Sequence, residues 1–396
     1  MIKVGVIFGG ESVEHEVSII SAVQAMNKLN QDKYEIVPIY ITKNNEWYTG
    51  EMLKDIETYQ DIDLIKKYAT NVVLYCKDNR FVLQSKSFFK RIVREIDIAM
   101  PIGHGASTED GVLQGYLRMI GMPFVGCDVC ASAIAQDKII QKQIWSHFDL
   151  PMVRYEWFYD SEYLDDSAAV LKRLKNLKYP LILKPATLGS SVGIATAKSE
   201  QDLIKAIEIV LDYDSKVIVE EMVSNLTEVN ISVLGNYEKQ DFSVIEQVMS
   251  DNDLLTYEDK YINGSKKTGN QSMKKGMASA LRKIPADISE KLANEVREIA
   301  TVAFKVLGAS GVSRIDFLVD SKKNKVYINE INPCPGSLSF YLWEPAGKRY
   351  SELLDDMINI GVKDYKKRVS KIHSFESNIL KGYSNGFKGA KGKLKG

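Results

Sequence analysis

Short apolar runs and helical patterns alternate over the first part of the chain. Residues 2–8 form a β-branched run that ends at Gly9-Gly10, residues 16–29 have the spacing of a helix, and residues 34–41 form a second apolar run. This order predicts a β-α-β unit. Such units build parallel sheets whose ligands collect at the carboxyl ends of the strands, so the turn from Gly9 to Ser18 is a candidate site.

Further strands and helices follow along the chain. The predicted strands cover residues 72–75, 80–83, 96–101, 155–158, 181–184, 217–221, 228–234 and 243–248, and the predicted helices cover residues 112–119, 132–148, 167–176 and 288–307. Residues 45–90 are less periodic, and we expect a small β-rich elaboration there. Residues 254–284 are rich in Lys, Gly, Ser and Asn, and a loop of that length usually covers a site or is disordered.

Residues 314–332 predict a β-hairpin that carries carboxylates among apolar residues. Because strand side chains alternate between faces, Arg314 and Asp316 share a face of one strand, and Glu330 and Asn332 share a face of the next. The turn between the strands brings the two sets within about 8 Å of each other. Buried acids are costly without a compensating cation, and oxygen ligands suit Mg²⁺ together with nucleotide phosphates. The alternative is a solvated hairpin with chance acids.

The loop from Lys184 to Gly193 follows a buried strand and is rich in Gly and Ser. Its backbone N–H groups can close around an anion, although it does not have the G-x-x-x-x-G-K-[ST] form. A plain surface turn is the alternative for this loop alone. Together with the acidic hairpin it indicates a nucleotide, whose phosphates need both N–H donors or lysines and a magnesium ion. A dinucleotide fold is disfavoured, because Gly9-Gly10-Glu11-Ser12 is not G-x-G-x-x-G.

Composition narrows the classes of protein. Lys plus Arg equals Asp plus Glu at 52 each, so we expect no nucleic acid and no anionic membrane as partner. The first residues do not read as a secretory signal and no apolar run approaches a spanning length, so we expect a cytoplasmic protein. The 4 cysteines are too few for a disulfide framework, and Cys127 and Cys130 lack a second ligand pair at zinc-finger spacing.

Several short motifs occur in an order that resembles the D-alanine–D-alanine ligase family of ATP-grasp enzymes, from Met1 to about Ile360. They are Gly9 to Ser18, His104-Gly105 with Glu109-Asp110-Gly111, Asp137-Lys138, the Lys184 loop, Glu258-Asp259-Lys260-Tyr261, Arg314-Ile315-Asp316, and Glu330-Ile331-Asn332 with Pro335-Gly336. The resemblance implies an α/β fold with an N-terminal parallel-sheet β-α-β domain followed by a two-lobed ATP-grasp fold. It also implies a homodimer that uses ATP to join two D-alanines through an acyl phosphate, for peptidoglycan precursor synthesis.

The resemblance implies four segments in a chain that is too long for one core. They are an N-terminal substrate domain over residues 1–126, a central lobe over 127–220, a C-terminal lobe with the metal site and a closing loop over 221–375, and a basic tail over 376–396 that we expect to be disordered.

The resemblance also implies roles for individual residues. Asp316, Glu330 and Asn332 match the ligands of two magnesium ions, with Mn²⁺ as an alternative. Lys138, Lys184, Ser191, Glu220, Val223 and Glu228 match ATP contacts, Glu220, Val223 and Glu228 at the adenine hinge and ribose. Glu14, His104, Lys260, Tyr341 and Leu342 match substrate contacts, while Glu14, Ser190, Tyr261, Arg314 and the backbone N–H of Gly336 match catalytic groups. Lys142, by contrast, is expected to be an exposed surface lysine.

One departure from the family pattern concerns the acceptor. The family commonly has N-T-x-P-G followed by a serine that holds the carboxylate of the second substrate, whereas Tyr341 occupies that position here. A phenol can donate the same hydrogen bond but changes the size of the pocket, and Lys260 could pair with that carboxylate. D-serine or a larger D-amino acid is therefore an alternative acceptor. A nucleotide-binding regulator without turnover and a dehydrogenase are alternatives from other classes.

Overall fold

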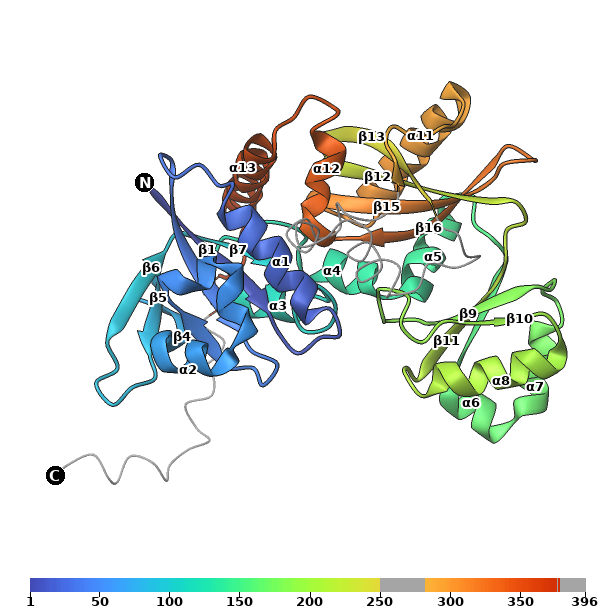
Figure 1. Ribbon diagram of the computed structural model, residues 1–396, viewed down its shortest axis with the longest axis horizontal. Helices are drawn as coiled ribbons and strands as arrows, with labels where there is room; N and C mark the ends of the chain where they lie inside the picture. Colours follow the sequence, from blue (N-terminus) through green and yellow to red (C-terminus); the bar gives the residue numbers. More distant parts are fainter. Residues whose placement is uncertain (250–281, 376, 378–396) are drawn as a thin grey trace.

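The computed structural model describes residues 1–249, 282–375 and 377, and its strands form three sheets (Figure 1). Most of the segment expected to cover the site, including Lys260 and Tyr261, lies outside the described residues, as does nearly all of the basic tail. Within the described residues, no helix is long and apolar enough to cross a membrane.

The first sheet has the order β6-β5-β4-β3-β2-β1-β7. Its parallel part is β2 (Tyr34–Ile41), β1 (Ile2–Gly9) and β7 (Ile98–Ile102), as the β-α-β pattern predicts. The other four strands, β3 (Trp47–Thr49), β4 (Thr70–Lys77), β5 (Arg80–Ser85) and β6 (Ile92–Ile96), extend it with antiparallel pairing. The sheet is therefore mixed, and the β-rich elaboration is its continuation.

The single strand expected over residues 96–101 is wrong, because β6 ends at Ile96 and β7 begins at Ile98. The side chain of Asp97, between them, accepts a hydrogen bond from the Lys3 N–H at 2.8 Å. This hydrogen bond holds the bend between β6 and β7 against the start of β1.

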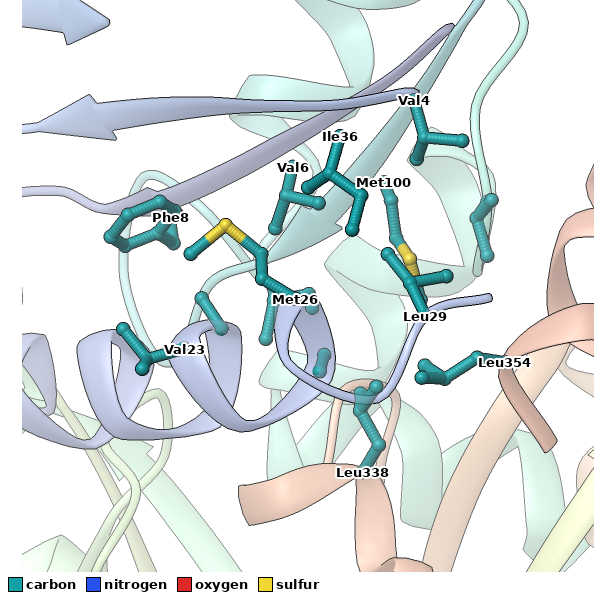
Figure 2. Packing of buried hydrophobic residues seen from close by; sticks show 14 of the residues in the cluster. Val4, Val6, Phe8, Val23, Met26, Leu29, Ile36, Met100, Leu338 and Leu354 are labelled. Carbon is teal, nitrogen blue, oxygen red and sulfur yellow. The ribbon is translucent and has the colours of Figure 1, made fainter. Parts of the chain in front are cut away.

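Helix α1 (His15–Met26) covers one face of β1. Figure 2 shows the core between them, formed by Val4, Val6 and Phe8 of β1, Val23 and Met26 of α1, Leu29, Ile36 and Met100, together with Leu338 and Leu354 from the far end of the sequence. Leu354 belongs to α13 (Tyr350–Val369), a helix that the sequence analysis missed. The C-terminal part of the chain thus packs against the first sheet.

After α3 (Val112–Met119), which has the predicted bounds, the helix expected over 132–148 is two helices, α4 (Val129–Gln136) and α5 (Lys138–His147). Asp137 separates them, and its carboxylate accepts hydrogen bonds from the N–H groups of Ile139 and Ile140 at 2.9 and 3.0 Å. A side-chain acceptor of this kind starts a new helix. Lys138 therefore occupies the first turn of α5.

The second sheet is antiparallel, with the order β10-β9-β11-β8. Its strands are β8 (Tyr155–Tyr159), β9 (Leu181–Pro185), β10 (Ala195–Ala197) and β11 (Lys216–Glu221), and α6 (Asp160–Asp165), α7 (Ser167–Leu174) and α8 (Glu200–Leu211) lie beside it (Figure 1). Helix α8 was not predicted. The chain enters this sheet from α5 and leaves it after β11.

The third sheet has the order β14-β13-β12-β15-β16 and is also antiparallel. Its strands are β12 (Leu226–Gly235), β13 (Gln240–Val248), β14 (Arg282–Lys283), β15 (Gly311–Asp320) and β16 (Lys325–Asn332). Helix α11 (Glu290–Val306) packs against it, and residues of α4 and α5 join the same core. After β16 come the short helices η5 (Gly336–Ser339) and α12 (Phe340–Trp343).

Candidate functional site

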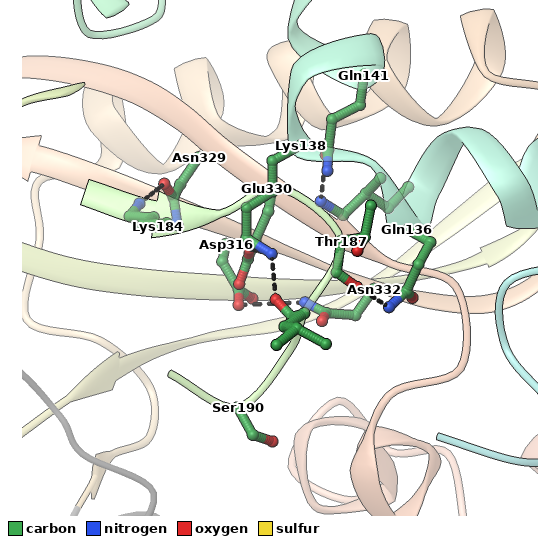
Figure 3. A network of polar contacts seen from close by, with 12 residues as sticks. Gln136, Lys138, Gln141, Lys184, Thr187, Ser190, Asp316, Asn329, Glu330 and Asn332 are labelled. Carbon is green, nitrogen blue, oxygen red and sulfur yellow. Dashed lines mark hydrogen bonds and ion pairs between the residues drawn. The ribbon is translucent and has the colours of Figure 1, made fainter. Parts of the chain in front are cut away.

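The predicted acidic hairpin is β15 and β16, and a register shift between Asp316 and Phe317 sets which of its polar side chains lie opposite each other. Asp316 lies opposite Glu330, and Arg314 lies opposite Asn332. Arg314 donates from Nε and Nη2 to the two oxygens of Asp316 at 2.6 and 2.7 Å, and Asn332 Nδ2 donates to Asp316 at 3.2 Å. Figure 3 shows Asp316, Glu330 and Asn332 side by side on the hairpin.

These three side chains fit a magnesium ion by the chemistry of their donors. Two carboxylates directly opposite each other repel unless a cation compensates them, and magnesium prefers oxygen ligands. Among the residues that the structure describes, no three His, Cys, Asp or Glu side chains form a metal-binding group. The amide oxygen of Asn332 is a further oxygen that this hairpin offers beside the two carboxylates.

Lys138 joins the hairpin to the phosphate-type loop. Its ammonium donates to the carbonyl of Leu188 at 2.7 Å and lies 3.5 Å from an oxygen of Glu330. The loop is held from other sides as well, because Thr187 donates from its N–H and its hydroxyl to Asp214 at 2.9 and 2.8 Å. Lys138, Asp316 and Glu330 thus lie close together beside the loop (Figure 3).

The loop itself has the backbone of an anion-binding turn. Ser190 and Ser191 have φ angles of 54° and 60°, and Gly193 has a φ of 71°. The N–H of Val192 donates to the carbonyl of Gly189 at 3.2 Å, so these residues form a tight turn, a conformation in which backbone N–H groups can create a concave site for an anion. This geometry supports the phosphate-cradling role predicted for residues 184–193.

Lys184 is the last residue but one of β9, where the loop begins. Its ammonium lies 2.5 Å from one oxygen of Glu220 and donates to Asn329 Oδ1 at 3.3 Å. The other oxygen of Glu220 lies 2.8 Å from the ammonium of Lys142. Burial opposes the ionisation of Glu220, but the two ammonium groups outweigh burial and lower the pKa of its carboxyl to about 2.

The expectation that Lys142 is an exposed surface lysine is wrong. Its side chain is 1% exposed, because α5 turns it toward β11 and Glu220. Glu220 is also 1% exposed, so its carboxylate is directed at the two lysines and not at solvent. Val223 and Glu228 are partly buried on either side of the turn between β11 and β12, where the hinge contacts were expected.

The first turn of the N-terminal domain meets the same loop. The hydroxyl of Ser190 donates to the carboxylate of Glu14, a buried residue just before α1. Two glycines make room for that carboxylate: a Cβ at Gly189 would lie 2.8 Å from Glu14 Oε2, and one at Gly105 would lie 3.2 Å from it. Glu14 and Ser190 are thus brought together, as the resemblance implied, although they lie far apart in the sequence.

His104 and Ser337, the residue after Gly336, are linked through Ser21 of α1. His104 Nε2 forms a 2.9 Å hydrogen bond with the Ser21 hydroxyl, whose oxygen also accepts the N–H of Ser337 at 2.8 Å. Burial lowers the pKa of His104, and the nearby Glu14 only partly opposes this. His104 is therefore a neutral imidazole near neutral pH, and Ser21 positions the turn that begins at Gly336.

Glu109 is a buried acid to which the sequence analysis assigned no role. It accepts the N–H of Gly105 at 2.8 Å and the N–H of Cys334 at 3.1 Å, and so connects the His104 loop to the loop before Gly336. Burial raises the pKa of its carboxyl to about 8, with the charge of Glu14 acting in the same direction. The only sequence feature that pointed to a role for Glu109 was its position in the motif Glu109-Asp110-Gly111.

Tyr341 lies in a buried polar cluster beside Arg314. Its hydroxyl donates to Glu246 at 3.3 Å, and the guanidinium of Arg282 lies 4.3 Å from the centre of its ring. Arg282 also donates to Glu246 at 2.7 Å. The side chain of Leu342 is fully buried, so any contact that it makes with a substrate has to come from its backbone.

Comparisons with known proteins agree over almost the whole chain. A family model described as the D-ala D-ala ligase N-terminus matches residues 3–127, and one described as the C-terminus matches residues 144–359. The D-alanine–D-alanine ligase of Thermosipho melanesiensis is 38% identical over 382 residues, which are 96% of this chain and 99% of the relative. The solved D-alanine-D-alanine ligase from Coxiella burnetii has a TM-score of 0.78 at 28% identity and covers 93% of this chain and 96% of its own. The VanG D-Ala:D-Ser ligase from Enterococcus faecalis has a TM-score of 0.74 at 30% identity and covers 91% and 99%.

Proposed function

The chain belongs to the D-alanine–D-alanine ligase family, and on that premise we propose that it uses ATP to join two D-alanines for peptidoglycan precursor synthesis. It is a ligase with an ATP-grasp fold. The observation that carries the proposal is the convergence of the acidic hairpin, Lys138 and the phosphate-type loop, since a transferable phosphoryl group needs cations on both sides.

Asp316, Glu330 and Asn332 would hold two magnesium ions, with manganese as an alternative. When bound, the ions compensate the charge of the phosphate oxygens and act as Lewis acids. The chain's own cations act from the other side, because Lys138 and Lys184 present ammonium groups and the loop presents its N–H groups. The hinge around Glu220, Val223 and Glu228 would hold adenine and ribose, and Ser191 lies in the phosphate loop.

The first D-alanine would be oriented by its ammonium group at Glu14, which Ser190 fixes through a hydrogen bond. An oxygen of its carboxylate attacks the γ-phosphorus, and ADP leaves as the acyl phosphate forms. The neutral His104 lies at the same pocket. Tyr261 and Lys260 are proposed to close this pocket and to reach the second substrate.

In the second half of the reaction, the amine of the second D-alanine attacks the acyl carbon. The tetrahedral intermediate carries a negative oxygen, which Arg314 and the backbone N–H of Gly336 would stabilise by preorganised donors. Collapse of this intermediate expels phosphate and leaves the peptide bond, and the attacking nitrogen loses its proton. Arg314 keeps its charge throughout, because the Asp316 carboxylate outweighs burial and raises the pKa of the guanidinium.

D-serine is a second candidate for the acceptor. Tyr341 already donates its hydroxyl to Glu246, so the group that was expected to hold the acceptor carboxylate is engaged elsewhere. One solved relative is a D-Ala:D-Ser ligase. Tyr341, Leu342 and Lys260 are therefore the residues on which the choice of acceptor would depend.

ADP release with single D-amino acids and with pairs tests the proposal. We expect D-alanine alone to stimulate release and L-alanine not to, with one dipeptide formed per ADP. Stimulation only by D-alanine with D-serine would favour the second candidate. No stimulation by any pair would leave a nucleotide-binding regulator as the better account.

The remaining proposals concern organisation. We propose a cytoplasmic homodimer whose residues 1–126, 127–220 and 221–375 act as substrate domain, central lobe and C-terminal lobe. Light scattering of the purified chain would give a mass of twice 44.6 kDa. A single monomeric mass at micromolar concentration would contradict the dimer and leave the catalytic proposal untouched.

A further inference from the structure

Lys142 lies one helical turn after Lys138 in α5, so that the two lysines share a face of the helix. They differ in what they contact. Lys138 reaches the loop and the hairpin, whereas the Lys142 side chain is 1% exposed and contacts Glu220 at 2.8 Å and the ring of Tyr155 at 5.9 Å. Since it is enclosed by protein, Lys142 cannot itself contact a nucleotide.

Glu220 lies between two lysines: Lys142, which is enclosed by protein, and Lys184, which lies at the start of the phosphate-type loop. One carboxylate oxygen faces Lys142 and the other faces Lys184 at 2.5 Å. Two ammonium groups and one carboxylate leave a net charge of +1. Without Lys142, Glu220 and Lys184 would form a neutral pair, and the site would have lost the excess positive charge that attracts an anion.

A buried ammonium group is costly, and it is retained where a charged partner compensates it. Burial lowers the pKa of Lys142, and the carboxylates of Glu220 and Glu330 oppose this only in part. The same two carboxylates hold the pKa of Lys184 above its ordinary value against the effect of burial. The two ammonium groups lie on either side of one carboxylate, at 2.8 and 2.5 Å, and the three groups form a unit that spans α5, β9 and β11.

We propose that Lys142 is a positioning residue for phosphate binding: it occupies one oxygen of Glu220, cancels its charge, and so keeps Lys184 available to the nucleotide phosphates. The inference rests on the proposed function, in which Lys184 contacts ATP. It assigns to a fully buried lysine a role in the affinity for phosphate, without any contact to the ligand.

The test measures the affinity of the full chain for ATP, ADP, AMP and adenosine by calorimetry in the presence of magnesium. In K142M the charge of the unit falls to zero, so ATP should bind about tenfold or more weakly, ADP and AMP should lose progressively less, and adenosine should bind as in the wild type. A merely structural role would weaken adenosine and ATP alike. The matched control is K348M, which removes a partly buried lysine paired with Asp356 near α13 and should leave every affinity unchanged.

A second variant keeps the inference open to refutation. K142M/E220Q removes one charge of each sign, so the net charge at Lys184 is again +1. The ratio of its affinities for ATP and for adenosine should therefore be close to the wild-type ratio. An equal loss for all four ligands in K142M, or wild-type affinity for ATP, would overturn the inference. If K142M does not fold, weak ATP binding with intact adenosine binding in the double variant would overturn it. Failure of the proposed function is a distinct result, because it would appear as no ADP release by the wild type with any D-amino acid, whether or not ATP binds.

Discussion

Replacing Arg314 by lysine separates its two roles, the oxyanion donor and the counter-ion of Asp316. The arginine side chain is 12% exposed and grips both oxygens of Asp316 at 2.6 and 2.7 Å. A lysine keeps the charge but offers no planar fork, so it can satisfy one oxygen at a time. The substitution therefore keeps the positive charge and removes the paired hydrogen bonds to the two oxygens of Asp316.

The size of the effect follows from these contacts. Loss of one buried charge-assisted hydrogen bond should lower the free energy of unfolding by about 2 kcal/mol. Loss of one oxyanion donor should lower kcat by about 100-fold to 1000-fold. The KM for ATP should stay within about threefold of the wild type, because Arg314 acts on the acyl group and not on the nucleotide.

Two measurements check this prediction: ADP release at saturating substrates, and denaturant unfolding of the same preparations. The matched control is R349K, since Arg349 donates to Glu352 at 2.7 Å in an exposed pair at the start of α13. It should change neither kcat nor the unfolding midpoint. If R314K loses stability as expected but keeps kcat within about tenfold, Arg314 is only a counter-ion and the oxyanion assignment fails.

Other substitutions test neighbouring parts of the site. Asp316→Ala and Glu330→Gln should abolish magnesium-dependent ADP release, and wild-type rates in either would remove the metal assignment. Burial raises the pKa of Glu109 from 4.5 to about 8, so between these values the folded protein keeps a proton that the unfolded chain loses. As the pH rises from about 5 to about 8, this group therefore lowers the free energy of unfolding by about 1.4 kcal/mol per pH unit. E109Q should flatten that part of the stability profile in denaturant titrations, and an unchanged slope would speak against a protonated acid. Y341S removes a buried ring, should lower the free energy of unfolding by about 3 kcal/mol, and should admit D-amino acids larger than alanine; a product profile by mass spectrometry identical to that of the wild type would refute this.

The parts of the site that lie on regular strands could be predicted from the sequence. Strand alternation and a short turn predict the hairpin and which residues share a face of each strand, whereas the pairing of Asp316 with Glu330 depends on a register shift next to Phe317. The phosphate-type loop was recognised for a similar reason, since its glycines and serines follow a buried strand directly. Local sequence determines both features.

Lys142 and Glu109 show where local reasoning fails. A lysine in a helical pattern is normally exposed, and only the packing of α5 against β11 brings Lys142 to Glu220. Glu109 is buried because a loop from the far C-terminal part of the chain covers it through the N–H of Cys334. Contacts of this kind depend on how separate segments assemble, and no pattern within either segment encodes them.

Errors in the predicted elements have a similar origin. One helix was predicted where Asp137 ends α4 and caps α5, because an apolar periodicity that continues across a cap conceals it. The β-rich elaboration was expected, but its antiparallel pairing with the first sheet was not, because β3 and β2 are segments whose individual patterns say nothing of direction. Helix α13 was missed although its apolar face packs beneath the first sheet.

The central claim is that a carboxylate of D-alanine becomes an acyl phosphate, and isotope transfer tests it most directly. D-alanine labelled with ¹⁸O in its carboxylate is supplied with ATP, and the released phosphate is analysed by mass spectrometry together with the dipeptide. The account predicts one ¹⁸O atom in each phosphate and one phosphate per dipeptide. Unlabelled phosphate would mean that water, and not the amino acid, receives the phosphoryl group, and would contradict the account.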